Sequence, residues 1–372
     1  MSMNCIIGTL VLAHALSLPT PLRDDDTDNA PVRWTHVSSI AWSPSGRELV
    51  FATDRGYEKV TDLRGRSPAA RYLWRVRSDG TGLRQITFPD GPVHYSDSNA
   101  RWSPDGRTIV FDSDRDPTDT AQGTARLRQI HLCDADGGNL RQITDAANGR
   151  SNREPCWSPD GRRLAWVTIG FNRTGIAVAD AGGKEIAWVR VTPRHVPGRR
   201  DCDSVLPWDP CWTADGKFLV YRTTRMGDPP KGHKPVVAPA GLSICPVPAE
   251  ASTDEARLRV LATFEDDFGL GGGTCSPVGQ DVAFVCRDEG YADLWLCPLD
   301  GSGQRRLTDL RSLRLSARQR VCPAWSPDGA VIAFAAQSGR SLPPGTYEDG
   351  IWLYRLSDGE IKEIPMPPPG PL

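Results

Sequence analysis

Short runs in which apolar and polar residues alternate recur along the chain, and a turn motif centred on Trp-Ser-Pro-Asp-Gly interrupts them. The motif or a close variant occurs six times, with steps of 60, 55, 55, 63 and 50 residues between equivalent positions. Ser-Pro-Asp-Gly suits a type I turn, because proline presets φ and the final glycine tolerates positive φ. Each motif is therefore predicted to join two antiparallel strands. The six occurrences are residues 42–46, 102–106, 157–161, 212–216, 275–279 and 325–329.

Each repeat continues in the same way after this turn. An aromatic residue follows nine positions after each Trp-equivalent, where it is predicted to pack between neighbouring units: Phe51, Phe111, Trp166, Tyr221, Phe284 and Phe334. A third strand, an Asp- and Gly-rich turn and a short fourth strand complete the repeat, as in residues 129–144. No segment shows a sustained helical period. The pattern predicts an all-β, six-bladed β-propeller with four antiparallel strands per blade.

Two segments carry a resemblance to a known family. Residues 157–166 (Trp-Ser-Pro-Asp-Gly-Arg-Arg-Leu-Ala-Trp) and 134–144 (Asp-Ala-Asp-Gly-Gly-Asn-Leu-Arg-Gln-Ile-Thr) resemble the WD40-like repeat of the TolB-like six-bladed propellers. The resemblance covers roughly residues 33–365 and departs locally, with Ala214 in place of proline and Cys275 in place of tryptophan. It implies a propeller fold and a protein or peptide partner in the cell envelope. It implies no single activity, because such propellers serve as adaptors, substrate gates and enzymes.

Net charge and the sequences at the two termini indicate the class of partner and the segments that flank the propeller. The net charge of −2 gives no general attraction to nucleic acid, so no nucleic-acid partner is expected. The apolar run at residues 6–18 is too short to span a bilayer and is typical of a signal peptide. We expect a signal peptide at 1–18, a disordered lead at 19–32, the propeller at 33–365 and a proline-rich tail at 366–372, with no transmembrane segment. The protein is then exported or periplasmic, and cytoplasmic if the apolar run is not a signal.

The ten cysteines do not form a C-x-x-C pair, which excludes a zinc ribbon. Cys133, Cys245 and Cys297 share one phase of the third strand, where the first repeat has valine. Cys156 and Cys211 share the position before a motif tryptophan. Free cysteine behaves as a small hydrophobe, so packing is predicted at these five positions. Cys202, on a long polar loop, is the better candidate for a disulfide or a reactive thiol.

Candidate binding residues fall on one face of the predicted ring. The connections between second and third strands, and those between blades, are long and share that face, where binding usually resides. The inner strand of each blade begins there, and three residues before the Trp-equivalent it carries Ser39, Asn99, Glu154, Asp209, Gly272 or Cys322. Asn99, Glu154 and Asp209 are therefore predicted to line the channel mouth. Oxygen ligands of this kind suit Ca²⁺, with Glu154 and Asp209 as its ligands. The alternative is that these acids pair with Arg101 and Arg153 or are hydrated.

Two of the long connections are strongly basic. One contains Arg194, His195, Arg199 and Arg200, and the other contains Arg314, Arg318 and Arg320. Such loops suit an acidic peptide or an anionic glycan, although nearby aspartates can also neutralise them.

The chain carries no common enzyme signature: G-x-S-x-G, H-E-x-x-H and the phosphate-binding loop are missing. The sequence thus favours a non-catalytic binding or scaffolding propeller that engages a protein or peptide through its loop-rich face and needs no cofactor. The alternative is a propeller hydrolase or lyase that acts on a polysaccharide or peptide at the channel mouth. A purely structural role in a larger assembly is a third hypothesis. The last repeat supplies all four of its strands, so the ring is predicted to close without a swapped N-terminal strand.

Overall fold

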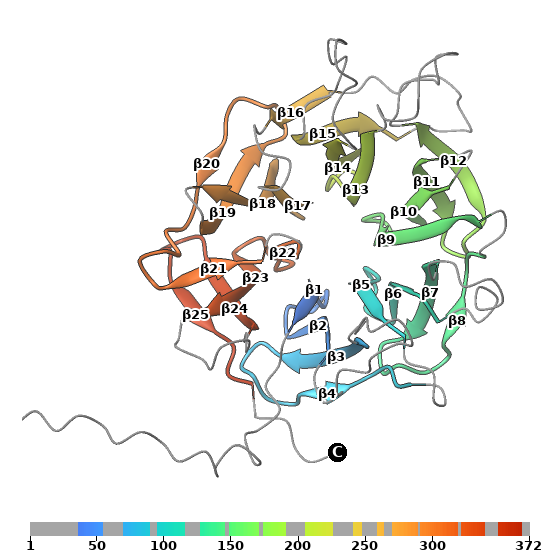
Figure 1. The fold of residues 1–372 in the computed structure, drawn as a ribbon, viewed down its shortest axis with the longest axis horizontal. Helices are drawn as coiled ribbons and strands as arrows, with labels where there is room; N and C mark the ends of the chain where they lie inside the picture. The colour runs from blue at the N-terminus through green and yellow to red at the C-terminus, as the bar shows by residue number, and fades with distance from the viewer. Residues whose placement is uncertain are drawn as a thin grey trace, which may run out of the picture. The chain divides into compact units, whose positions relative to one another are not determined.

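The computed structural model describes residues 36–54, 70–89, 95–115, 127–145, 149–170, 174–190, 205–225, 241–247, 259–263, 270–288, 291–318, 321–338 and 349–366, all within the unit Arg33–Leu372. The secondary-structure elements in these ranges are all β-strands, and they form six antiparallel sheets around a common axis (Figure 1). Within the described residues, no helix is long and apolar enough to cross a membrane. The predicted six-bladed propeller with four antiparallel strands per blade is confirmed.

Consecutive strands pair within each blade, and the first strand of the blade lies nearest the axis (Figure 1). Blades 1 to 3 consist of β1(Val37–Trp42), β2(Glu48–Thr53), β3(Tyr72–Arg77) and β4(Arg84–Gln85); β5(Asp97–Trp102), β6(Thr108–Ser113), β7(Gln129–Asp134) and β8(Arg141–Gln142); and β9(Ser151–Trp157), β10(Arg163–Ile169), β11(Gly175–Asp180) and β12(Glu185–Arg190). Blades 4 and 5 consist of β13(Val205–Trp212), β14(Phe218–Arg225), β15(Gly241–Pro246) and β16(Arg259–Thr263); and β17(Leu270–Cys275), β18(Asp281–Asp288), β19(Tyr291–Pro298) and β20(Arg305–Arg306). In blade 6 the inner strand is split into β21(Leu315–Ala317) and β22(Ala324–Trp325), which both pair with β23(Val331–Ser338), followed by β24(Asp349–Arg355) and β25(Ile361–Glu363).

The repeated motif forms the predicted turn between the first two strands of a blade. In blade 2 the amide of Gly106 donates to the carbonyl of Ser103 over 2.9 Å, and Gly106 has a φ of 71°. Asp105 accepts hydrogen bonds from the Ser103 hydroxyl and the Arg107 amide, so the motif satisfies its own polar groups. The turns also stack around the ring, since a Cβ on Gly106 would lie 3.7 Å from Pro44 of blade 1.

The hydrophobic core lies between the blades. Phe334 of blade 6 belongs to one apolar cluster with Val285 and Leu294 of blade 5, and Phe284 of blade 5 clusters with Val220 and Leu242 of blade 4. All six aromatic side chains at this position are buried. The prediction that these side chains pack between blades is confirmed. Their burial explains why every repeat has a large aromatic residue at this position.

Among the described residues, side-chain contacts close the ring and no sheet is shared between the first and last blades. Within the described residues, β1 pairs only with β2, and blade 6 takes all its strands from residues 315–363. Instead, the Trp42 indole donates to the carbonyl of Ala324 over 3.1 Å, and the amide of Val37 donates to the carboxylate of Asp349 over 3.0 Å. The ring therefore closes as predicted, without a swapped strand from residue 36 onward.

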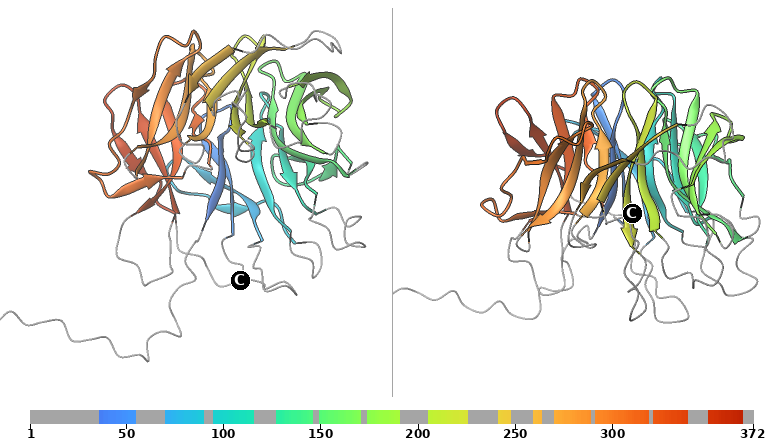
Figure 2. Two further views of the ribbon diagram at one scale, coloured as in Figure 1. Left: turned by 45° about the horizontal axis from the view of Figure 1, so that its top comes forward. Right: turned by 90° about the horizontal axis from the view of Figure 1, so that it is seen from above.

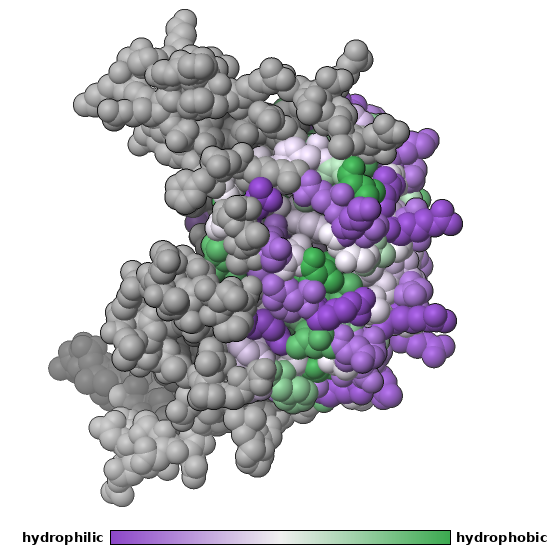
Figure 3. Space-filling model, turned by 90° about the vertical axis from the view of Figure 1, so that its right-hand side faces the viewer, coloured by the Kyte–Doolittle hydropathy of each residue, from purple (hydrophilic) through white to green (hydrophobic). Residues whose placement is uncertain are grey.

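The two ends of the propeller differ in their connections. Because consecutive strands are antiparallel, the Ser-Pro-Asp-Gly turns share one end, at which the described strands are joined tightly (Figure 2). The connections between second and third strands leave from the other end, in agreement with the predicted loop-rich face. The outer edge around β8 and β12 is mainly polar, with scattered apolar side chains (Figure 3).

The buried cysteines fill space in the core. Cys133, Cys156, Cys245 and Cys297 are buried and unpaired, as their phase in the repeat predicts, whereas Cys211 is partly exposed. Burial raises the pKa of the Cys133 thiol to about 12, so that this group stays protonated. Cys202 and residues 1–35 lie outside the described residues, so the disulfide candidate and the signal peptide remain predictions.

Candidate functional site

A repeated irregularity of the inner strands places polar side chains at the axis. The pairing of the first two strands shifts register at Ser98/Arg101 in blade 2, between Cys156 and Arg153 in blade 3, and at Trp208/Cys211 in blade 4. Each shift marks a β-bulge, which re-aims a side chain at the cost of local pairing. The residues inside these bulges are the three predicted channel-mouth residues: Asn99, Glu154 and Asp209.

All three residues adopt a left-handed backbone, with φ of 55° at Asn99, 56° at Glu154 and 53° at Asp209. Asparagine and aspartate tolerate this conformation better than most residues, but glutamate has no such preference. A non-glycine residue held there costs about 1–3 kcal/mol and persists only where its surroundings enforce it. Because three such residues occur at the same position of three consecutive blades, the surrounding structure must enforce this conformation near the axis.

Hydrogen bonds between blades hold the bulges in place. The backbone amide of Glu154 donates to the carboxylate of Asp112 in blade 2 over 2.7 Å. The backbone amide of Asp209 donates in turn to the carboxylate of Glu154 over 2.5 Å. The carboxylate of one blade thus fixes the bulge of the next, from blade 2 to blade 4. We call Asn99, Asp112, Glu154 and Asp209 the axial cluster.

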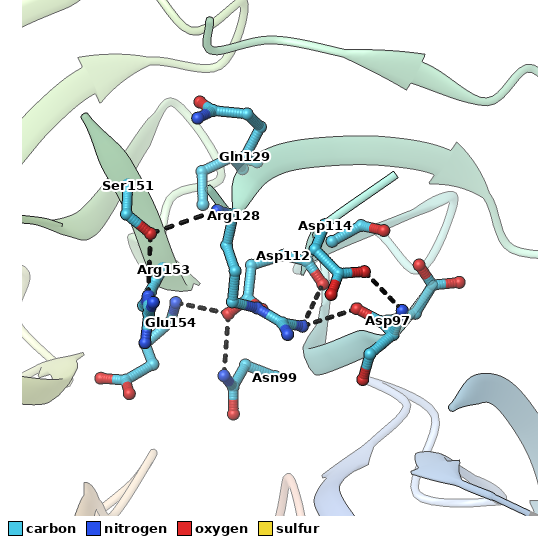
Figure 4. Close-up of polar contacts among 12 residues, drawn as sticks. Asp97, Asn99, Asp112, Asp114, Arg128, Gln129, Ser151, Arg153 and Glu154 are labelled. Atoms are coloured by element: carbon cyan, nitrogen blue, oxygen red, sulfur yellow. Dashed lines mark hydrogen bonds and ion pairs between the residues drawn. The ribbon is translucent and has the colours of Figure 1, made fainter. Parts of the chain in front are cut away.

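Asp112 is the anchor of the axial cluster, and it is fully buried. Its carboxylate forms an ion pair with Arg128 and also accepts a hydrogen bond from the side-chain amide of Asn99 over 2.8 Å. Figure 4 shows the Asn99 amide nitrogen turned toward Asp112 and the Asn99 oxygen turned away from it. The Glu154 carboxylate likewise points away from the Arg128 pair (Figure 4). The anchor therefore holds the side chain of Asn99 and the backbone of Glu154, and the side-chain oxygens of both residues are directed away from it.

The environment of Glu154 favours its protonated form. Burial, and then the neighbouring charge of Asp209, raises the pKa of Glu154 from its ordinary 4.5 to about 8. Asp209 itself lies 3.3 Å from the guanidinium of Arg222, which offsets its charge. A carboxyl group with a raised pKa beside a second carboxylate is an arrangement typical of functional sites.

This shift predicts a pH dependence of stability. Between pH 5 and pH 8 the folded chain keeps a proton on Glu154 that the unfolded chain has released, so raising the pH favours unfolding. We expect the free energy of unfolding to fall across this window, with a slope of up to about 1.4 kcal/mol per pH unit from this group. Urea titrations of the wild type and Glu154→Gln at several pH values measure the slope. Parallel pH profiles for the two proteins would contradict the assignment.

The equivalent inner-strand positions of blades 5, 6 and 1 carry Gly272, Cys322 and Ser39, none of which has a charged side chain. A Cβ on Gly272 would lie 2.2 Å from the Cys322 sulfur and 2.5 Å from the Asp209 carboxylate, so a side chain at position 272 would displace both groups. Burial, and then the charge of Asp209, raises the pKa of the Cys322 thiol well above its usual value. Ser39 is buried in blade 1. The polar groups are therefore concentrated in blades 2 to 4.

The arginines expected to pair with the acids take other partners. Arg101 donates to the carbonyls of Ile40 and Ala100, and Arg153 donates to the Ser151 hydroxyl. Asp209 does pair with an arginine, as that alternative expects, but the partner is Arg222 on β14. Asp112 pairs with Arg128, which directly precedes β7. Sequence reasoning selects arginines that are close to the acids along the chain. Arg222, however, is 13 residues from Asp209, and Arg128 is 16 residues from Asp112.

The metal prediction concerns the same carboxylates. In the described ranges, no group of three or more His, Cys, Asp or Glu side chains is arranged to hold a metal ion. Ca²⁺ takes six to eight oxygen ligands, so Glu154 and Asp209 would need several further oxygens from elsewhere. The Ca²⁺ site stays a prediction.

The predicted basic surface is only partly described. Arg194, His195, Arg199, Arg200 and Arg320 lie outside the described residues. Arg314 is exposed and has a left-handed backbone with φ of 54°. Arg318 forms an ion pair with the buried Asp349 at 2.5 Å, so its charge is committed to the closure of the ring.

Comparisons with known proteins support the fold. A protein of Streptomyces coelicolor assigned as a tricorn protease homolog is 31% identical over 254 residues, which is 64% of this chain and 18% of that protein. A TolB homolog of Chlorobium luteolum is 27% identical over 231 residues, 62% of this chain and 32% of that protein. The chain thus spans less than a third of these two curated relatives. No family model matches the sequence.

Solved structures agree with these relatives. The structure of a protein assigned as TolB from Agrobacterium tumefaciens superposes with a TM-score of 0.53 at 17% identity, covering 79% of this chain and 87% of the other. At such identity the likeness concerns the fold alone. Sequence relatives and structural neighbours together show that this chain has the six-bladed propeller fold of the TolB-like and tricorn-like proteins.

Proposed function

We propose that the chain is a non-catalytic binding propeller that engages a protein or peptide partner at its loop-rich face, with the axial cluster as the point of contact. The observation that carries the proposal is the left-handed backbone of Asn99, Glu154 and Asp209 on three consecutive blades. Strained backbone concentrates where a site is pre-organised for a ligand. In this chain the strain directs an amide, a protonated carboxyl and a carboxylate to one region at the axis.

The chemistry of these groups suits a polar peptide segment. Below pH 8 the Glu154 carboxyl carries a proton and can donate a hydrogen bond, while Asp209 accepts. Asn99 offers its side-chain oxygen on the side turned away from Asp112 (Figure 4). Peptide groups carry one donor and one acceptor each, so a row of mixed donors and acceptors matches them. An anionic glycan held by the basic connections is the alternative ligand.

The cellular setting is also proposed. The apolar run at residues 6–18 supports export to the periplasm or beyond the cell, where a partner in the envelope would be met. Fusion of residues 1–35 to a reporter that is active only after export tests this proposal. Retention of the reporter in the cytoplasm would contradict it.

A selection experiment tests the binding proposal. A displayed library of random peptides is selected on the wild-type protein, and the affinity of each recovered peptide is measured by calorimetry. We expect Asp209→Asn to weaken binding about tenfold, the loss of a charge-assisted hydrogen bond of ~1.4 kcal/mol. Asp215→Asn, in the turn at the opposite end of the same inner strand, is the matched control and should bind as the wild type. Recovered peptides that bind both variants equally would contradict an axial contact.

The second candidate function is a hydrolase or lyase acting on a polysaccharide or peptide at the same place. The raised pKa of Glu154 beside the charged Asp209 favours it, because a carboxylic acid and a carboxylate side by side can act as general acid and base. Incubation of the recovered peptides and of polysaccharides with the protein, followed by mass spectrometry, separates the two functions. A product that disappears in Glu154→Gln, with binding retained, would establish the enzyme.

A further inference from the structure

The seam between blades 4 and 5 contains two cysteine side chains in contact. The sulfur of Cys211, on β13, lies 2.9 Å from the sulfur of Cys275, on β17. The backbone amide of Cys275 also donates to the Cys211 sulfur over 3.2 Å. A disulfide needs a sulfur–sulfur separation of about 2.05 Å, so a movement of about 1 Å brings the two atoms to bonding distance. Both side chains are partly exposed, which admits a small oxidant.

Two other seams show a contact that the Trp-equivalent position can make in this repeat. Across the seam from blade 6 to blade 1, the Trp42 indole donates to the carbonyl of Ala324, the residue before the blade 6 tryptophan. Across the seam from blade 5 to blade 6, the Trp325 indole donates to the carbonyl of Thr274 over 3.0 Å. In both cases the Trp-equivalent of one blade reaches the residue that precedes the Trp-equivalent of the previous blade.

The cysteine pair occupies this same contact. Cys275 stands at the Trp-equivalent position of blade 5, and Cys211 directly precedes Trp212, the Trp-equivalent of blade 4. Repeat 5 thus has cysteine in place of the motif tryptophan, and the residue that this cysteine contacts in blade 4 is also a cysteine. Cys275 cannot make the indole hydrogen bond of Trp42 and Trp325, which the indoles of Trp102, Trp157 and Trp212 also do not make. At the seam between blades 4 and 5 the two sulfur atoms are in contact at this position.

We propose that Cys211 and Cys275 form a disulfide that joins blades 4 and 5. The oxidant is a disulfide of the glutathione or thiol–disulfide oxidoreductase class. The thiolate of one cysteine attacks the oxidant and displaces one thiol, and the second cysteine then attacks the mixed disulfide and displaces the other. Two protein S–H bonds and one oxidant S–S bond are lost, while one protein S–S bond and two oxidant thiols form, so two electrons pass to the oxidant. The disulfide goes beyond the proposed function and does not depend on it.

A third cysteine lies nearby and competes for the same bond. Burial raises the pKa of the Cys156 thiol and of the Cys275 thiol alike, so the pKa does not distinguish the two. Cys156 is buried, whereas Cys211 and Cys275 are both partly exposed. Access and the sulfur–sulfur contact therefore both favour the pair that spans blades 4 and 5.

Mapping of thiols tests the disulfide directly. The purified chain is reduced, freed of reductant, treated with oxidised glutathione, denatured and alkylated, and then digested with trypsin and chymotrypsin. Chymotryptic cleavage at Trp208 separates Cys202 from Cys211, and cleavage at Phe284 separates Cys275 from Cys286. We expect the loss of two alkylatable thiols per chain and one linked peptide that joins Cys211 to Cys275. Free Cys211 and Cys275, or a link from either to Cys156 or Cys202, would overturn the proposal.

Variants give a second readout. A disulfide across 64 residues is expected to raise the midpoint of thermal unfolding by roughly 5 °C on oxidation. Cys211→Ser and Cys275→Ser should each abolish this rise, whereas Cys245→Ser, at a buried cysteine of blade 4, should keep it. If the serine variants do not fold, the thiol map of the wild type still decides the question. A rise that persists in Cys275→Ser would overturn the proposal.

Discussion

Asp112→Asn is expected to lower the free energy of unfolding by about 3–5 kcal/mol, the usual cost of removing one member of a buried ion pair. The substitution keeps the shape of the side chain but removes the charge that faces Arg128. It also weakens the acceptor for Asn99 and for the backbone amide of Glu154. Because those bonds hold two bulges, we further expect the axial cluster to lose its order. Urea unfolding monitored by tryptophan fluorescence measures the effect.

The control for this substitution is another aspartate of the same blade. Asp105→Asn alters an exposed turn carboxylate that accepts from Ser103 and from the Arg107 amide, and it should cost about 1 kcal/mol. A loss at Asp112 no larger than the loss at Asp105 would show that Asp112 does not anchor the axis.

The second large effect is expected at the closure of the ring. Asp349 is buried, accepts the backbone amide of Val37 from blade 1 and forms an ion pair with Arg318. Asp349→Ala leaves this amide without its acceptor and the guanidinium without its partner, so the free energy of unfolding should fall by about 3 kcal/mol. Blades 1 and 6 should then separate at lower denaturant than the rest of the ring.

Asp358 offers a matched control in blade 6. It forms an exposed ion pair with Arg355 at 3.0 Å, and exposed pairs contribute little to stability because solvent screens them. Asp358→Ala should therefore leave the unfolding midpoint nearly unchanged. Hydrogen exchange at β1 that rises no more in Asp349→Ala than in Asp358→Ala would contradict the proposed closure.

The sequence predicts well those features that lie within one repeat. The motif turn, the strand order and the buried aromatic are local, and each is present in several copies, so their spacing along the chain is sufficient to identify them. Asn99, Glu154 and Asp209 were likewise found at equivalent positions by counting back from the tryptophan of each repeat. Their left-handed backbone was not predicted, because glutamate has no preference for it and nothing in the flanking residues indicates a bulge.

The parts that sequence reasoning missed are contacts between blades and between strands. Asp112 lies one residue before the end of β6, and its role as an anchor depends on the backbone amide of Glu154, 42 residues further along the chain. Arg318 was assigned to a basic surface, but its partner Asp349 lies 31 residues away on β24. Pairings of this kind follow from the closed geometry of the ring and leave no periodic signal.

The most direct test of an axial binding site is hydrogen–deuterium exchange of the protein with and without a peptide recovered from the selection. We predict that binding protects the segments 151–157 and 205–212, whose bulges carry Glu154 and Asp209, and leaves the turns at 103–106 and 158–161 unchanged. Protection confined to those turns, or to the outer strands β8 and β12, would place the partner elsewhere and contradict the account.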